Sequence, residues 1–172
     1  HRTITLRAGF ETSPDVAVFA RASLYDQGRN NGTQLQVNDT ANQSVAVAGR
    51  FSTIDRSNWT ISLFGSKQLY HQVFTSVATN RASESLTRQQ AVPSNDVGLR
   101  AKWSKATNGV HTLFGGIEVR GVRGTSDEVA FVNNKATAFV SAGGRQRRLG
   151  FFAQDYISIG TRWALAVSGR YD

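Results

Sequence analysis

Residues 162–171 read RWALAVSGRY, and in this stretch apolar side chains alternate with small or basic ones at every step. Successive side chains of a β-strand point to opposite faces of its sheet, so a period of two predicts a strand with one apolar face. Trp163, Leu165 and Val167 fall on that face, and Arg170 falls on the other. We therefore interpret this stretch as a β-strand that meets two different environments.

The same alternation recurs along the whole chain. Each run has about the length that a tilted strand needs to cross a bilayer, roughly nine to eleven residues. No stretch has a convincing helical period or the about 18 apolar residues of a transmembrane helix. The runs cover residues 3–10, 16–25, 44–54, 59–70, 97–103, 111–120, 149–159 and 162–171.

The connections between these runs are alternately short and long. The short ones are residues 11–15, 55–58, 105–109 and 160–161, and the long polar ones are residues 27–43, 72–95 and 123–148. Membrane barrels have short periplasmic turns and longer outer loops. The pattern therefore predicts an all-β fold of about eight antiparallel, up-and-down transmembrane strands, with the three long connections forming the outer mouth.

Composition is compatible with this fold. The chain of 172 residues is long enough for one domain, and we find no linker. Its lack of Cys excludes disulfide frameworks and thiolate metal sites. Its mean hydropathy of −0.32 is no argument against a membrane location, because only one face of each barrel strand meets lipid.

The net charge of +8 lies largely on the polar faces of the predicted strands. In a large barrel such faces line the lumen, where a positive field attracts anionic ligands or acidic groups of a plug. A simpler interpretation is that these residues satisfy one another, a plug or lipopolysaccharide phosphates. The candidate lumen-facing residues are Arg7, Arg21, Arg50, Arg100, Lys102, Glu118, Arg120, Arg162 and Arg170.

Several aromatic residues lie beside the short connections, namely Trp59, Trp103, Trp163, Tyr156 and Phe10. Membrane barrels place aromatic girdles at their interfaces, where an apolar ring with a polar tip is stable. The alternative is the aromatic core of a soluble sandwich. Position beside the turns favours the girdle.

Asp155 does not fit the alternation, because its parity groups it with Phe151 and Ile157. A carboxylate facing lipid is unfavourable and requires a partner. A bulge, or an inward assignment of this side chain, would also resolve the conflict, and the sequence does not choose among these.

Residues 150–172, GFFAQDYISIGTRWALAVSGRYD, resemble a hairpin of the barrels of TonB-dependent outer-membrane receptors. In that family an aromatic residue, Gln and Asp precede a short turn, as Phe152, Gln154 and Asp155 do here, and the next strand closes on Gly-x-Arg-Tyr-Asp, here residues 169–172. Residues 111–120, HTLFGGIEVR, are similar to the preceding strand type.

The resemblance implies a bacterial outer-membrane location and a barrel of 22 strands. Residues 1–172 would be a partial barrel domain of roughly eight strands, with no plug domain or TonB box in this chain. It further implies partnership with TonB through a plug, contact with outer-membrane lipid and lipopolysaccharide, and uptake of a ligand such as a ferric chelate or another anionic nutrient. It implies no cofactor.

Three other functions are compatible with part of the sequence. A complete eight-stranded barrel could act as an adhesin or a structural element. A soluble basic β-protein could bind nucleic acid, since the pI is about 10.6, but the basic residues alternate with apolar ones rather than forming one patch. An enzyme would need His71 beside a loop serine; the candidates are Ser76, Ser83 and Ser85. We expect neither an enzyme nor a nucleic-acid partner, and no metal site.

Overall fold

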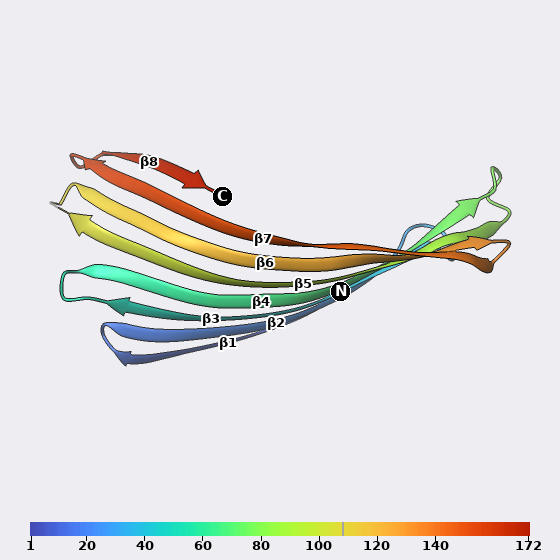
Figure 1. The fold of residues 1–172 in the computed structure, drawn as a ribbon, viewed down its shortest axis with the longest axis horizontal. Coiled ribbons are helices and arrows are strands. Elements are labelled where there is room, and N and C mark those ends of the chain that lie inside the picture. Colours follow the sequence, from blue (N-terminus) through green and yellow to red (C-terminus); the bar gives the residue numbers. More distant parts are fainter. Residues whose placement is uncertain (108) are drawn as a thin grey trace.

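The computed structural model describes residues 1–107 and 109–172 as one antiparallel sheet of eight strands (Figure 1). Each strand pairs with the next one in the sequence, in the order β1 to β8. This confirms the predicted all-β, up-and-down fold. The strands are β1 (Arg2–Ser13), β2 (Val16–Asn30), β3 (Val37–Ser52), β4 (Ser57–Val77), β5 (Glu84–Thr107), β6 (His111–Val132), β7 (Lys135–Ile159) and β8 (Trp163–Tyr171). None of the described residues belongs to a helix of the length and apolar character needed to cross a membrane.

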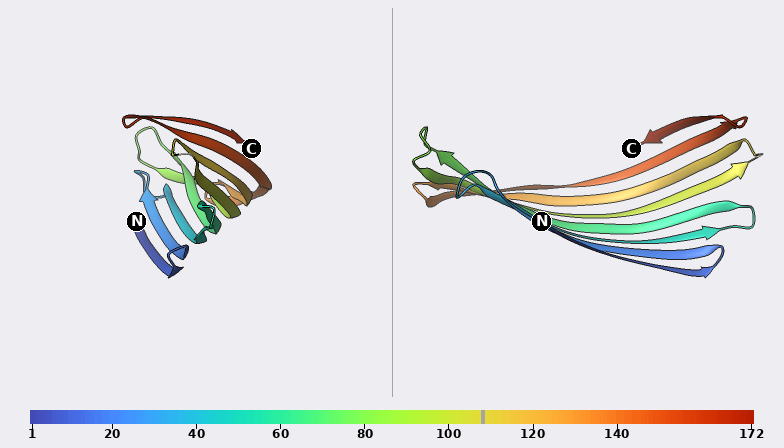
Figure 2. Two further views of the ribbon diagram at one scale, coloured as in Figure 1. Left: turned by 90° about the vertical axis from the view of Figure 1, so that its left-hand side faces the viewer. Right: turned by 180° about the vertical axis from the view of Figure 1, so that it is seen from behind.

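The sheet is curved but open. Among the described residues, β1 pairs only with β2 and β8 only with β7. Figure 2 shows the sheet along its strands as an arc rather than a ring. The alternative of a small barrel that closes on itself is therefore not what these residues form. In lipid, each unpaired backbone group at an open edge costs several kcal/mol.

The strands are longer than the sequence predicts, and the three predicted long loops are wrong for most of their length. β7 has 25 residues and β5 has 24. The connections between β2 and β3 and between β4 and β5 are only residues 31–36 and 78–83. Asn133 and Asn134, at φ 51° and 60°, form the whole turn between β6 and β7, as a two-residue hairpin turn with two positive φ angles requires.

The physical reason lies in the solvent beyond the bilayer. A strand pairs through backbone hydrogen bonds whatever its side chains are, but only lipid selects apolar side chains on one face. Toward the connections at residues 31–36, 78–83 and 133–134, the strands continue while their apolar alternation stops. We call this the hairpin end of the sheet, and the opposite end, with the β1–β2, β3–β4, β5–β6 and β7–β8 connections, the tight-turn end (Figure 1).

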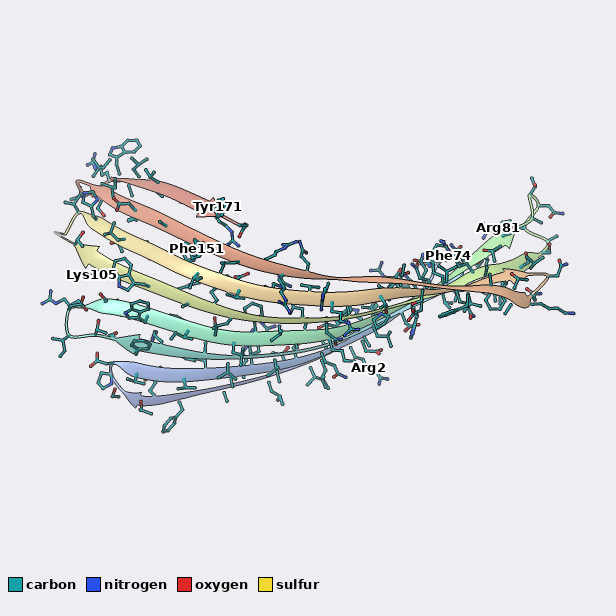
Figure 3. All side chains as sticks on the ribbon, in the orientation of Figure 1. Arg2, Phe74, Arg81, Lys105, Phe151 and Tyr171 are labelled. Carbon is teal, nitrogen blue, oxygen red and sulfur yellow. The ribbon has the colours of Figure 1, made fainter. Side chains whose placement is uncertain are left out.

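The tight-turn end is held by side chains as well as by backbone. The Asp55 carboxylate accepts hydrogen bonds from Lys105 Nζ at 2.8 Å and from Ser57 Oγ at 2.9 Å. These donors, with Lys105 first, hold the pKa of the Asp55 carboxyl well below its usual range. Figure 3 shows Lys105 at this end of the sheet. The β3–β4 turn is thereby joined to β5.

Phenylalanine rings cover glycines of neighbouring strands at three places on one face. The cross-strand partners are Phe19 with Gly9, Phe64 with Gly98, and Phe152 with Gly116. A Cβ added at Gly98 or Gly116 would overlap the partner ring. Such pairs shield the glycine backbone and fix the register of the strands.

We expect Gly98→Ala to destabilise the purified protein by about 1–3 kcal/mol, because the new methyl group displaces the Phe64 ring. The double variant Phe64→Ala/Gly98→Ala relieves the overlap and costs less than the sum of the two single changes. Unfolding in detergent micelles measures both.

Gly49→Ala is the matched control, since a Cβ there meets nothing within 4 Å. Strictly additive effects at Phe64 and Gly98 would contradict the proposed packing.

Candidate functional site

Register divides the sheet into two faces. Leu63 lies opposite Val47 on β3 and Leu99 on β5, and Leu99 in turn lies opposite Val119 on β6. We call the face that carries these residues the apolar face and the other one the polar face. No second layer covers the apolar face in the described structure, and Leu63 is 56% exposed. A continuous apolar surface of this kind is stable against hydrocarbon rather than water.

All but one of the predicted lumen-facing residues share the polar face. The exception is Arg162, which lies in the turn between β7 and β8 rather than on a strand. That this face lines a lumen remains a prediction. The residues on it are Arg7, Arg21, Arg50, Arg100, Lys102, Glu118, Arg120 and Arg170.

Two of these arginines are neutralised by acids of an adjacent strand. Arg100 Nε donates to Glu118 Oε2 at 2.5 Å, and Arg120 donates to Asp96. The side chains of Glu118 and Asp96 are only 14% and 11% exposed. Partly buried charges are tolerated when paired in this way. Sequence analysis missed Asp96, because nothing in the alternation distinguishes it from other polar-face residues.

Arg170 has a partner that the sequence did not suggest. Its guanidinium donates to both carboxylate oxygens of Asp172: Nε lies 2.9 Å from Oδ1 and 2.8 Å from Oδ2, and Nη2 lies 2.6 Å from Oδ1. Arg170 is the penultimate residue of β8, and Asp172 directly follows the end of that strand. A period-two offset between Arg and Asp is the signal that could have found this pair.

Other polar-face cations lack such partners. Among the described residues, Arg7, Arg21 and Lys102 form no ion pair, and Arg50 reaches Glu11 only at 4.0 Å. Arg7 and Arg21 lie directly opposite each other on β1 and β2. Like charges in that position repel. The polar face therefore holds uncompensated positive charge near β1 and β2, where an anion would stabilise it.

The connections at the hairpin end are tied together into what we call the outer rim: residues 31–36, 78–84 and 133–134. Thr33 Oγ1 donates to Glu84 Oε1 at 2.5 Å, and the Leu35 N–H donates to Glu84 Oε2 at 2.9 Å. Arg81 Nη2 donates to the Gly32 carbonyl at 2.9 Å. Figure 3 shows Arg81 at this end.

Glu84 is the centre of the rim. Partial burial raises the pKa of its carboxyl, but the hydrogen bonds from Thr33 and Leu35 outweigh this effect and place the pKa below its usual value. The turn at residues 133–134 is tied to β5, because the Leu86 N–H donates to Asn134 Oδ1 at 3.2 Å. The predicted mouth thus consists of cross-linked strand hairpins rather than long free loops.

The aromatic residues beside the tight turns divide between the faces. Trp59 and Trp103 are cross-strand partners on the apolar face, and Phe51 stacks on Trp59 with ring centroids 6.3 Å apart. Trp163 also lies on this face and is 77% exposed. Tyr156 lies on the polar face, so its grouping with an outward girdle is wrong.

Asp155 lies on the apolar face, opposite Leu113. The register is continuous there, so neither a bulge nor an inward orientation relieves the carboxylate. Its partner is His111, whose Nδ1 lies 2.7 Å from Asp155 Oδ2. The pair lies close to the tight-turn end. Sequence analysis placed His111 at the start of a strand but did not pair it with Asp155; its place two residues before Leu113 on one face was the missed signal.

His71 does not meet the serines that an enzyme would require. Its Nδ1 lies 3.0 Å from Asp39 Oδ2, and the structure shows no hydrogen bond from it to Ser76, Ser83 or Ser85. This arrangement supplies no activated hydroxyl.

Comparisons with known proteins agree with this geometry. Residues 2–172 match the family model described as "TonB dependent receptor-like, beta-barrel". The solved structure of the ferripyoverdine receptor of the outer membrane of Pseudomonas aeruginosa, bound to ferripyoverdine, superposes with a TM-score of 0.73 at 11% identity, covering 98% of this chain and 29% of that chain.

A structure of a complex of FpvAI with pyocin S2 gives a TM-score of 0.67 at 12% identity and covers 98% of this chain and 30% of that one. The chain thus spans about three-tenths of the length of these structures. A comparison with curated proteins found no match. At 11–12% identity, the structural likeness shows only a shared fold. The family model matches 171 of the 172 residues. The chain belongs to the TonB-dependent receptor-like β-barrel family, which is a family of receptors of the bacterial outer membrane.

Proposed function

We propose that these eight strands are a segment of a larger outer-membrane barrel that takes up an anionic nutrient. The open sheet supports this proposal most directly, because β1 and β8 each leave one edge without a partner among the described residues. In lipid, neighbouring strands have to satisfy those edges. This chain also covers only 29% and 30% of the two matched structures, which supports a larger barrel.

The polar face lines the lumen in this proposal. Arg7 and Arg21 supply a positive field that draws an anion inward, and Lys102 extends it toward β5. Arg100 and Arg120 contribute less to that field, since Glu118 and Asp96 neutralise them. A ferric chelate with catecholate or several carboxylate oxygens has the required negative charge.

Energy for uptake would come from TonB through a plug domain, which would occupy the lumen beside the polar face. The strands themselves would act as a rigid scaffold and would carry no catalytic site. The receptor that matches in fold is bound to ferripyoverdine, which supports a ferric chelate as the class of ligand here.

Removal of the unpaired lumen charge should weaken ligand binding. We expect Arg7→Gln/Arg21→Gln to lower the affinity of the full-length receptor for its ferric chelate about tenfold at low ionic strength. The difference should shrink at high ionic strength, because salt screens charges over about 10 Å at 0.1 M. Titration of a panel of ferric chelates, followed by tryptophan fluorescence, measures it.

Arg162→Gln is the matched control, since it removes a positive charge from the β7–β8 turn and leaves the polar face unchanged. Equal weakening by the control, or a double variant with wild-type affinity and wild-type salt dependence, would contradict the proposed role of the polar face.

Glu84 should control the order of the outer rim. We expect Glu84→Gln to accelerate amide hydrogen exchange at Leu35, because a neutral amide is a weaker acceptor for the Thr33 and Leu35 donors. The pKa of the Glu84 carboxyl is lower in the folded protein than in the unfolded chain. The wild-type carboxylate therefore stabilises residues 31–36 fully at pH values above its ordinary pKa of about 4.3, and this stabilisation is lost as the pH falls through the folded pKa.

Hydrogen exchange measured by mass spectrometry across that pH range tests this, with Glu11→Gln at the tight-turn end as control. Unchanged exchange at Leu35 in Glu84→Gln would refute the tether.

A further inference from the structure

Acids are distributed unequally over the polar face. Among the described strand residues of β1 to β3, the only acid on that face is Glu11, which lies 4.0 Å from Arg50. On β5 to β8, by contrast, three arginines each have an acid in direct contact. We call these six residues the ion-pair patch: Arg100 with Glu118, Arg120 with Asp96, and Arg170 with Asp172.

Gly150 of β7 allows the pair from β8 to join the other two. This glycine lies opposite Glu118 in the register. A Cβ added to it would overlap the Asp172 carboxylate and would lie 3.0 Å from Arg170 Nη2. The Arg170–Asp172 pair therefore lies over Gly150, where the charge of Arg170 also attracts that of Glu118. Charges of alternating sign thus extend from β5 to β8.

The acids of the patch are covered more fully than their arginines. The side chains of Glu118 and Asp96 are 14% and 11% exposed, whereas those of Arg100 and Arg120 are 39% and 42% exposed. An anion beside the polar face can therefore approach these guanidinium groups. It has to displace a carboxylate that already accepts charge-assisted hydrogen bonds from them.

That competition favours the carboxylate of the protein. An acid held on an adjacent strand has an effective concentration of roughly millimolar or higher at its arginine. A free anion binds the same arginine only when its own affinity outweighs this advantage. Arg7 and Arg21 have no such competitor, because neither forms an ion pair among the described residues. The two parts of the polar face therefore differ in their attraction for an anion, although both carry arginines.

We propose that Asp96, Glu118 and Asp172 are specificity-determining residues, which keep an anionic ligand away from the β5–β8 part of the lumen wall and confine it to the part with Arg7 and Arg21. This inference rests on the proposed function, because it takes the polar face as the lumen wall. Limited attraction is useful in a transport path, since a ligand bound tightly on every side leaves slowly.

Removal of an acid from the patch should strengthen the binding of anions. We expect Glu118→Gln to raise the affinity of the full-length receptor for ferric citrate, the anionic probe, about fivefold at low ionic strength, because Arg100 becomes available. The gain should appear mainly as slower dissociation in stopped-flow measurements and should shrink at high ionic strength. Asp96→Asn/Glu118→Gln should raise the affinity more than tenfold.

Asp127→Asn is the matched control. Asp127 lies on β6, as Glu118 does, but on the apolar face, so the substitution changes the net charge equally and leaves the patch intact. It should bind ferric citrate as the wild type does. Arg100→Gln/Glu118→Gln should also return to the wild-type affinity, because the double change removes the arginine that Glu118→Gln alone makes available.

Asp172→Asn guards against a folding defect. Glu118→Gln leaves a partly buried arginine without its partner, which lowers stability. Asp172 is 51% exposed, so its substitution perturbs packing less, and it should raise the affinity for ferric citrate about threefold through Arg170. A neutral ferric trihydroxamate should bind to all variants as it does to the wild type, because the acids act through charge.

Several results would overturn the proposal: unchanged or weaker binding of ferric citrate in both Glu118→Gln and Asp172→Asn, an equal gain in Asp127→Asn, or an equal gain for the neutral chelate. The proposed function fails separately, when Arg7→Gln/Arg21→Gln retains wild-type affinity and salt dependence. Glu118→Gln is therefore also measured in the Arg7→Gln/Arg21→Gln background, where its gain should persist, since Arg100 lies on a different part of the wall.

Discussion

The structure depends on one constraint: in hydrocarbon, every backbone N–H and C=O needs a partner within the protein. A continuous antiparallel ladder from β1 to β8 meets this demand between strands. Once the ladder satisfies the backbone, side chains can be chosen face by face. Lipid then selects Leu63, Leu99 and Val119 on one side, and these side chains remain exposed because no second protein layer is needed.

On the polar face, charged side chains lie against a sheet only one layer thick, and the partly buried ones require partners. Arg100 and Arg120 are compensated by acids from adjacent strands, and the Phe64 ring fills the space above Gly98. Arg7 and Arg21 have no such acid among the described residues. The polar face therefore carries both paired and unpaired positive charge, and we propose that the unpaired charge attracts the ligand.

Uncompensated cations occur on both faces, at different levels and toward different solvents. Arg7 and Arg21 belong to the polar face, which we assign to the lumen, whereas Arg123 and Arg145 lie on the apolar face, which we assign to lipid. In each case two arginines oppose each other across a strand pair, an arrangement that the protein alone does not stabilise. In the outer rim, by contrast, Glu84 has hydrogen-bond donors from Thr33 and Leu35.

The sequence alone determined the fold class, the strand order and the two faces, because lipid selects apolar side chains at every second residue of a strand and this period can be seen in a single sequence. It also identified Asp155 as a conflict with the alternation, but only the register of β6 and β7 placed its side chain on the apolar face. Only the tertiary structure decided that residues beyond the bilayer continue as strands, since water imposes no such pattern on them. Likewise, the partners of Asp155, Arg120 and Glu84 come from neighbouring strands or loops, and cross-strand register, rather than local sequence, brings those groups together.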